Sequence, residues 1–497
     1  MDGTGYEHLP TRHDVLNADI WSMILSFVDL ADAPSLSLVS RAIHPHARRI
    51  VLSCADIFQQ DQLTRACAFL LDDPHHRACW LRELHIDGDA LQDLEDRWES
   101  AEGLAIAAQL AELLHAAQNI HTLALPHVES LLEVDAGVGA ALISLKQLQV
   151  VSLSGILTGA LDVANKMASR PTEVYLNFAS PSSSYDMAEY FMLLSHLTLF
   201  SNAHTVEVVF FDISRPDRFE KPSDFSFEIP QLGQHSTVRE VGLRYSGPLP
   251  LFHIFPNMEV LRMRCMDETF ENFDWQDWAW TESVPLVDVT ADDDDQLVCL
   301  AGARPPTLRQ LHLHAPPLRS PEGDFSVDDL RPVCLAFPLQ EWQAPWNYDI
   351  PIWAGHLEAT PSPEFGSRLR YLEVTPDCHT QEDMPASWVE WLLPALREST
   401  LVCVRLNFNV DTPSGTVTKL DEVRRTLVEN VASLRYICIA VGRIPQSDLL
   451  WAYDSRVEGE CTWWRVRGKR ASTQSASRPR PVSASRSIYA RRSSNGR

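Results

Sequence analysis

A short apolar pattern recurs along most of this chain. In each copy, an apolar residue is followed at plus three and plus five by two more apolar residues, which places those side chains on one face of a short strand. The clear copies begin at Leu81, Ile120, Leu148, Val238, Met258, Leu308, Leu369, Leu401 and Leu434, and weaker copies begin at Pro171, Ala203, Val284 and Leu339. Pro285 lies inside the copy at Val284 and argues against a central strand there.

Helical segments are expected between these strands, because apolar residues there recur at helical spacing. The clearest are 104–117, 187–200, 328–337, 386–399 and 418–432. The thirteen copies begin about 29 residues apart on average, which is within the range of stacked repeats. A unit of one strand and one helix cannot cover its own apolar face, so we expect an α/β array with a parallel sheet inside. A doubly wound parallel sheet is the alternative fold.

Residues 15–57 have a different pattern, which predicts three short helices. Asn17 or Asp19 can cap a first helix whose apolar residues share one face, Pro34 begins a second, and Pro45 suits the first turn of a third. So small a unit buries little apolar surface, so part of its apolar stripe is expected to pack against another structure.

The motifs in this stretch are a leading Leu16, Asp-Ile-Trp-x-x-Ile-Leu-Ser-Phe at 19–27, an acidic turn, and Ser-Leu-Val-Ser-Arg at 37–41. Here the chain resembles an F-box, although that family usually has Pro where Asn17 stands and an aromatic residue near His44. The resemblance implies docking on the Skp-type linker subunit of a cullin-RING ubiquitin ligase. It assigns the contact to Leu16, Ile20, Ile24, Leu25, Leu36 and Val39. The alternative is that these residues only close a local helical core.

The region that follows resembles the leucine-rich repeats that often come after an F-box, as in fungal-type F-box proteins. The copies are irregular, because the ninth position holds Asp89, Val128, Ile156, Met266 or Pro316 in several of them where that family commonly has Asn or Cys. The expected fold is therefore a three-helix F-box and an irregular leucine-rich-repeat solenoid with parallel strands and outer helices. The expected segments are a flexible leader 1–14, the F-box 15–57, a helical linker 58–80, the solenoid 81–460 and a basic tail 461–497.

Charge is distributed unevenly. The net charge is −25, but the last 37 residues contain ten Lys and Arg and no Asp or Glu, so residues 1–460 carry −35. Such a body repels nucleic acid phosphates and anionic lipid surfaces. The tail has few apolar residues and is expected to be disordered. Within it, Arg465, Arg467, Lys469 and Arg470 form a candidate nuclear import signal, beside the alternative of a solubilising or phosphorylated tail.

The chain is expected to be an intracellular protein of the cytoplasm or nucleus. Its ten Cys residues include no Cys-x-x-Cys pair, which is typical of reduced and mostly buried thiols. The first 14 residues lack the features of a secretory signal, and no apolar run is long enough to span a bilayer. No membrane partner is therefore expected.

Motifs for catalysis are missing. The sequence contains no Gly-x-Ser-x-Gly, His-Glu-x-x-His or phosphate-binding glycine loop, and the glycine pattern at 137–142 ends in Leu142. The acidic and histidine residues at 72–76 with Cys79, and the run Asp292–Asp295, are weak metal candidates. We expect no catalytic residue, cofactor or metal. Aromatic residues near carboxylates at 267–295 and 342–353 suit either core packing or a contact surface for a basic and apolar partner.

Together these patterns favour a noncatalytic substrate-recognition adaptor, as the F-box resemblance implies. The helices would hold the ligase through the linker subunit, and the repeats would hold an unidentified protein target. The alternative is a repeat scaffold without a ligase contact, which the departures at Asn17 and His44 favour. An enzyme on a parallel sheet is the third class, and it would need a pocket of convergent polar groups.

Overall fold

The structure is a computed structural model that divides into two compact units. The first comprises Met1–Ile213, Ser226–Val241 and His253–Pro256, and the second comprises the remaining residues. The structure describes residues 18–25, 27–28, 31–41, 43–92, 100–179, 193–210, 233–244, 251–264, 285–291, 307–313, 332–339, 369–376, 393, 396–397, 399–409, 416–443, 458–467 and 470–473. The division between the units falls inside the span expected to form one repeat array.

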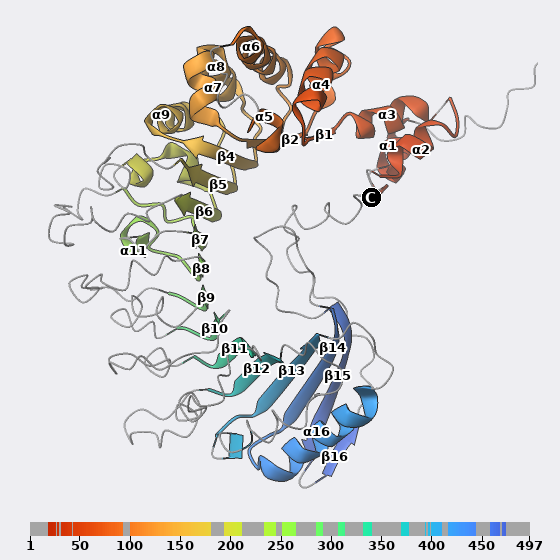
Figure 1. Cartoon of the computed structure of the whole chain (residues 1–497), viewed down its shortest axis with the longest axis vertical. Helices are drawn as coiled ribbons and strands as arrows, with labels where there is room; N and C mark the ends of the chain where they lie inside the picture. Colours follow the sequence, from red (N-terminus) through yellow and green to blue (C-terminus); the bar gives the residue numbers. More distant parts are fainter. Residues whose placement is uncertain are drawn as a thin grey trace, which may run out of the picture. The chain divides into compact units, whose positions relative to one another are not determined.

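The first unit begins with three short helices, α1 (Ala18–Leu25), α2 (Ala33–Ser37) and α3 (His44–Val51). Pro34 lies in the first turn of α2 and Pro45 in that of α3, where a proline has no hydrogen bond to lose. Both α1 and α2 pack against α3 (Figure 1). The group buries one residue from each helix, namely Leu25, Ala33 and Ala47, among the described residues 18–51.

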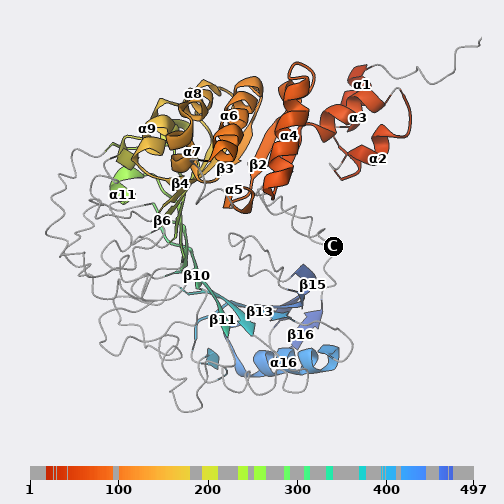
Figure 2. The ribbon, with the colours of Figure 1, turned by 45° about the horizontal axis from the view of Figure 1, so that its top comes forward.

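Alternating strands and helices form the rest of the first unit. Its strands are β1 (Cys54–Ile57), β2 (Glu83–Ile86), β3 (Thr122–Leu125), β4 (Val150–Ile156), β5 (Glu173–Phe178) and β6 (Thr205–Phe210), and β7 (Glu240–Arg244) crosses the division between the units. Its helices are α4 (Gln60–Asp72), η1 (Ala78–Trp80), α5 (Asp89–Gln92), α6 (Ala101–Ala116), α7 (Val128–Val134), α8 (Ala136–Ser144), α9 (Thr158–Lys166) and η2 (Thr198–Asn202). Helices α4, α6, α8 and α9 pack in a row along one face of the strands (Figures 1 and 2).

The second unit continues with parallel strands and ends with two antiparallel ones. The strands are β8 (Val260–Arg264), β9 (Asp288–Ala291), β10 (Gln310–Leu313), β11 (Cys334–Leu339), β12 (Tyr371–Pro376), β13 (Cys403–Asn409), β14 (Tyr436–Arg443), β15 (Glu458–Arg467) and β16 (Arg470–Thr473). The pairs β14–β15 and β15–β16 are antiparallel. Helix α16 (Thr416–Asn430) connects β13 to β14, and α11 (Leu251–Ile254) lies across the division between the units. Each unit is therefore a mixed α/β structure.

Equivalent positions of the apolar pattern stack from strand to strand. In the first unit Leu84 aligns with Leu123, Leu123 with Val151, and Val151 with Val174. In the second unit the same position aligns across Leu261, Val289, Leu311, Leu335, Leu372, Val404 and Ile437. These side chains are almost completely buried. The pattern thus sets both the register of the sheet and its core.

One backbone hydrogen-bond arrangement recurs at the start of the strands. The N–H groups of Arg82 and Glu83 both donate to the Ser53 carbonyl, at 2.7 and 2.9 Å. The N–H groups of His121 and Thr122 donate in the same way to Arg82. The arrangement continues at residues 149–150, 172–173, 204–205, 239–240, 287–288, 309–310, 333–334, 370–371, 402–403 and 435–436. The turns before the strands are therefore alike, although the intervals between them vary.

Twelve of the thirteen predicted strand positions are confirmed as strands, and the strand after Pro285 begins at Asp288. Neighbouring described strands within each unit are consecutive in the chain. A doubly wound sheet would reverse that order, so the alternative fold is not supported. The remaining predicted strand, which was expected to begin at Leu339, is wrong, because β11 ends at that residue. The predicted helix at 328–337 is also wrong across residues 334–337, which belong to β11. The pattern in β11 begins instead at Pro332, and Leu335 is its buried second position.

Two boundaries also differ from the prediction. Residues 54–57 form β1, which pairs with β2, so the helical group ends before the predicted residue 57. At the other end, the tail was expected to be disordered from residue 461, but residues 461–467 and 470–473 belong to β15 and β16. Trp464 lies opposite Ile437 on β14, on the face covered by α16, and Arg424 of α16 stacks over the Trp464 ring at 5.6 Å. The short alternation of apolar and polar residues in this part of the tail is typical of a strand, whereas its polar composition predicted disorder.

The predicted helices at 104–117 and 418–432 are confirmed as α6 and α16. In the segment 187–200, the residues described are 193–200, which end in the short helix η2. The leader 1–14, most of the segment 386–399, the aromatic stretch 342–353 and the tryptophans within 267–295 lie outside the described residues.

Candidate functional site

Large apolar side chains are exposed on α1, in the turn after it and directly after α2. They are Ile20, Met23, Ile24, Phe27, Leu38 and Val39, and together they are called the apolar helical surface below. The first four recur at i, i+3, i+4 and i+7, which places them on one side of α1 and the turn after it. Phe27 and Leu38 are each 85% exposed, and Val39 is 66% exposed. Apolar side chains this exposed are typical of a binding surface when they are grouped.

The predicted docking residues divide between the surface and the interior. Ile20, Ile24 and Val39 are exposed, and Leu36 is half-buried. Leu25 was expected to contact a partner, but it is only 3% exposed and belongs to the small core of the helical group. The physical reason is that Leu25 follows Ile24 directly, so the two side chains point about 100° apart around α1. Leu16 lies outside the described residues.

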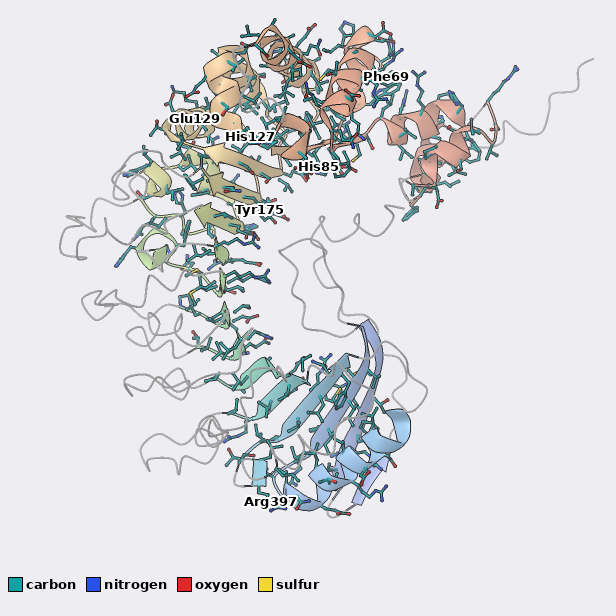
Figure 3. All side chains as sticks on the ribbon, in the orientation of Figure 1. Phe69, His85, His127, Glu129, Tyr175 and Arg397 are labelled. Atoms are coloured by element: carbon teal, nitrogen blue, oxygen red, sulfur yellow. The ribbon has the colours of Figure 1, made fainter. Side chains whose placement is uncertain are left out.

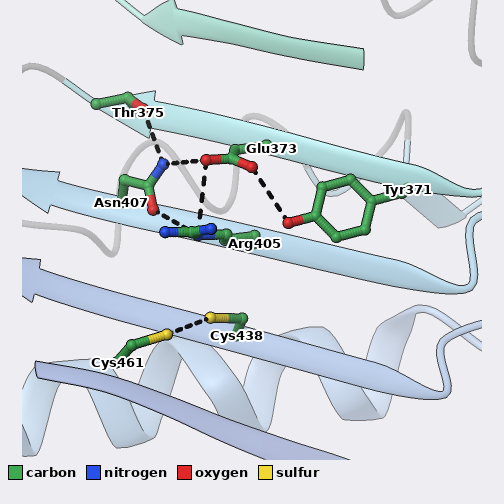
Figure 4. A network of polar contacts seen from close by, with 7 residues as sticks. All are labelled: Tyr371, Glu373, Thr375, Arg405, Asn407, Cys438 and Cys461. Carbon is green, nitrogen blue, oxygen red and sulfur yellow. Dashed lines mark hydrogen bonds and ion pairs between the residues drawn. The ribbon is translucent and has the colours of Figure 1, made fainter. Parts of the chain in front are cut away.

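A second candidate site is a polar network on β12 and β13 (Figure 4). The Glu373 carboxylate accepts hydrogen bonds from Asn407 Nδ2 at 2.7 Å and from the Tyr371 hydroxyl at 3.2 Å. Arg405 Nε donates to Asn407 Oδ1 at 2.9 Å and lies 3.6 Å from Glu373 Oε1. Asn407 Nδ2 also donates to Thr375 Oγ1 at 3.2 Å. Glu373, Thr375 and Asn407 are buried, so the network holds a paired charge inside the second unit.

The network lies on the sheet face opposite the stacked apolar residues, because Glu373 and Arg405 alternate with Leu372 and Val404. Burial raises the pKa of the Tyr371 hydroxyl, and the Glu373 charge raises it further. Burial alone would lower the pKa of Arg405, but Glu373 and Tyr371 outweigh that effect and raise it. The tyrosine therefore stays protonated and the arginine stays charged at neutral pH. An arrangement of this kind fixes a charge in place.

Sequence reasoning missed this network, because its partners are far apart in the chain. Asn407 and Glu373 are separated by 34 positions. The available signal was the fifth position of each copy, counted from its first apolar residue. That position holds Glu373, Arg405 and Cys438 in successive copies, and the register places each of them beside the next.

The predicted metal candidates were also located. His76 Nδ1 lies 2.9 Å from Asp73 Oδ1, and the Cys79 thiol donates to the His75 carbonyl. These contacts belong to the turn after α4. The run Asp292–Asp295 lies outside the described residues.

The structure brings together another group of residue types that can bind a metal, and the sequence analysis did not identify it. Cys54, Asp56 and His85 offer ligand atoms that lie within 4.8 Å of one another on β1 and β2, and Figure 3 labels His85. His85 Nδ1 lies 2.8 Å from Asp56 Oδ1, and the Cys54 thiol donates to the same oxygen at 3.5 Å.

The candidate nuclear import residues lie in or next to the last two strands. Arg465 is exposed on β15, and Arg467 pairs with Arg470 where β15 meets β16. Lys469 lies between them, outside the described residues. Their role in import stays a prediction, and Arg465, Arg467 and Arg470 belong to strands that pair with each other.

Across the helices that the structure describes, none combines the length and the apolar character required to cross a membrane.

Comparisons with known proteins assign no family to this chain. No model of a known protein family matches it, and no curated protein matches it in sequence.

Proposed function

We propose that this chain is a noncatalytic substrate-recognition adaptor of a cullin-RING ubiquitin ligase. In this proposal α1, α2 and α3 form an F-box that docks on a Skp-type linker subunit. The strand and helix units form an irregular leucine-rich-repeat solenoid that holds a protein target. The chain then contributes proximity between the target and the ubiquitin-carrying enzyme, and no bond-making chemistry of its own.

The apolar helical surface is the observation that carries this proposal. The F-box resemblance predicts that Ile20, Ile24 and Val39 contact the linker subunit, and all three are exposed. A monomeric protein rarely leaves grouped side chains of this size in water without a partner. The hydrophobic gain from covering Phe27 and Leu38, each 85% exposed, would be about 1.5–3 kcal/mol for each side chain that becomes fully buried.

The stacked register supports the repeat part of the proposal. Each described copy supplies one short parallel strand, and copies of about 29 residues with aligned apolar positions are typical of leucine-rich repeats. Repeats stacked in chain order expose an extended surface that suits a protein target. Residues 1–460 carry a net charge of −35, so a target with a basic surface would be favoured by charge complementarity.

A repeat scaffold without a ligase contact is the second candidate. It is favoured by Asn17 and His44, which depart from the F-box pattern, and by the lack of a match to any family model. His44 Nδ1 lies 3.0 Å from the Ser37 carbonyl on α2, so this histidine serves a local contact between helices.

Binding to purified Skp-type linker subunit distinguishes the two candidates. If the adaptor proposal is right, the intact chain binds the linker subunit. Ile24→Asp and Leu38→Asp should each raise the dissociation constant at least about tenfold, because each places a charge in an apolar contact. Leu104→Asp is the matched control, since Leu104 is an exposed leucine on α6, outside the apolar helical surface. It is expected to bind like the unaltered chain.

Two results would contradict the adaptor proposal. One is the lack of binding by an intact chain whose circular dichroism shows that it is folded. The other is an equal loss of affinity in Leu38→Asp and Leu104→Asp, which would indicate a general effect of charge. Either result would favour the scaffold, whose partners would then be captured by residues 81–460 without any cullin.

A further inference from the structure

Two cysteines approach each other closely on the last strands of the second unit. Cys438 lies on β14 and Cys461 on β15, and their sulfur atoms are 3.1 Å apart (Figure 4). The register pairs Cys438 with Trp463 and Cys461 with Ala440, so the two thiols lie diagonally across an antiparallel pair, on the same face. A disulfide needs a sulfur separation of about 2.05 Å, so the two sulfur atoms would have to approach each other by about 1 Å.

We propose that Cys438 and Cys461 form a reversible redox site, in which a peroxide closes a disulfide between β14 and β15 and a thiol reductant opens it. This inference does not depend on the proposed adaptor function, since it rests on the contact between the two thiols.

The two thiols differ in the way such a reaction requires. Cys461 is only partly buried, whereas Cys438 is completely buried. A hydrogen bond with the Cys438 thiol lowers the pKa of Cys461 to about 7, although burial opposes the shift. The same hydrogen bond, together with burial, raises the pKa of Cys438 well above its usual range. Cys461 is therefore the accessible nucleophile, and Cys438 is the resolving thiol behind it.

Other groups around the pair also shift the pKa of Cys461. Arg405 lies beside Cys438 in the register, and its guanidinium lowers the pKa of Cys461, as does a hydrogen bond with the Trp463 side chain. Glu373 acts in the opposite direction, but it is paired with Arg405. The polar network thus keeps a positive charge near the reactive sulfur.

The chemistry balances with hydrogen peroxide as the oxidant. The Cys461 thiolate attacks one peroxide oxygen, the O–O bond breaks, and the leaving hydroxide takes a proton to become water. Cys461 is now a sulfenic acid. The Cys438 sulfur, which loses its proton, then attacks the Cys461 sulfur, the S–O bond breaks, and a second water leaves. The two thiols have lost two electrons, which the peroxide has gained.

The test is peroxide treatment of the full chain, followed by alkylation of the remaining thiols, digestion and mass spectrometry. The expected product is a cross-linked peptide pair that joins Cys438 to Cys461 and disappears after dithiothreitol. The chain unfolded in urea is the comparison, and it should give a mixture of pairings. No Cys438–Cys461 cross-link in the folded chain would overturn the proposal, and so would equal yields of this pair in the folded and unfolded chains.

Variants assign the two roles. Cys438→Ser should leave Cys461 as a sulfenic acid that dimedone traps, whereas Cys461→Ser should give neither dimedone labelling at Cys438 nor a cross-link. Cys403→Ser is the control, because Cys403 is a buried thiol on the neighbouring strand β13, and this variant should keep the cross-link. A sulfenic acid at Cys438 in place of Cys461 would overturn the assignment.

The pH dependence gives a readout that does not need a variant. Alkylation of Cys461 should rise about tenfold between pH 6 and pH 8 and then level off, because its thiolate fraction saturates above a pKa of about 7. A rise of nearly a hundredfold without a plateau would indicate a thiol of ordinary pKa and would overturn the role of Cys461 as nucleophile.

Discussion

The three N-terminal helices and the strand units place their apolar residues in opposite ways. Leu84, Leu123 and Val151 are completely buried by their own chain, whereas Phe27 and Leu38 are 85% exposed. Both regions are built from similar apolar residues, so composition does not explain the contrast. The difference lies in how many neighbours each unit has along the chain. Each strand unit is covered by the copies before and after it, and among its described residues the helical group buries only one residue from each helix.

This contrast separates the apolar residues that the chain itself covers from those that it leaves exposed. The apolar positions of the strands are used for folding and have no capacity left for a partner. Phe27 and Leu38 are mostly exposed, so their side chains contribute little burial to their own chain. Substitutions in the two regions should therefore have opposite effects, large on stability in one and large on association in the other.

The largest effect on stability is expected for Leu123→Ala on β3. This residue is completely buried and aligned with Leu84 and Val151, so the substitution removes apolar contacts and leaves a cavity. The expected loss in the free energy of unfolding is about 2–5 kcal/mol. Urea unfolding, followed by hydrogen exchange of the β3 amides, measures it. A loss below about 1 kcal/mol would mean that the stacked positions are not the core of the first unit.

A smaller but clear loss is expected for Asn407→Ala in the polar network. The substitution removes one hydrogen bond to the Glu373 carboxylate and the acceptor of Arg405 Nε, both in a buried environment. The expected loss is about 2–3 kcal/mol, because two hydrogen bonds to charged groups are lost. Asn407→Asp gives a sharper comparison. The new aspartate side chain would keep an acceptor for Arg405 but would place a second carboxylate beside Glu373. Asn407→Asp should therefore lose at least as much free energy of unfolding as Asn407→Ala.

Most of the strands could be predicted because a buried parallel strand needs apolar residues at fixed positions. The prediction failed at β11, because the copy begins with Pro332, whereas Leu339 was predicted to be its first residue. It also failed at β1, whose second position is Ala55, a residue too small to stand out. In both places the neighbouring strands fix the register, which no single copy reveals.

The candidate sites were predictable only in part. Helical spacing placed Ile24 and Leu25 on one apolar face of the first helix, and it could not show that Ile24 is exposed while Leu25 is buried. The network of Glu373, Arg405 and Asn407 depends on pairing across strands, so it requires the copies to be aligned first. The two thiols at Cys438 and Cys461 depend on β15, which composition had suggested to be disordered.

A moderate loss is expected for Glu129→Ala on α7, labelled in Figure 3. The Glu129 carboxylate accepts hydrogen bonds from the backbone N–H groups of Leu157, Gly159 and Ala160 at 2.7–3.1 Å, at the start of α9. It acts as a cap supplied by another helix, so its removal should cost about 1–2 kcal/mol. Hydrogen exchange at the first turn of α9 checks this, and Glu129→Gln, which keeps an acceptor, should lose less. Unchanged exchange in Glu129→Ala would contradict the capping role.

The smallest effect on stability is expected for Phe27→Ser, which tests the other side of the comparison. A side chain that is 85% exposed contributes little burial, so the free energy of unfolding should stay within about 0.5 kcal/mol of the unaltered chain. Self-association, measured by light scattering, should decrease, because an exposed aromatic group is removed from the apolar helical surface. A loss above about 1 kcal/mol would mean that Phe27 packs against its own chain in solution. The contrast between the two regions would then disappear, and with it the reason to expect a partner on these helices.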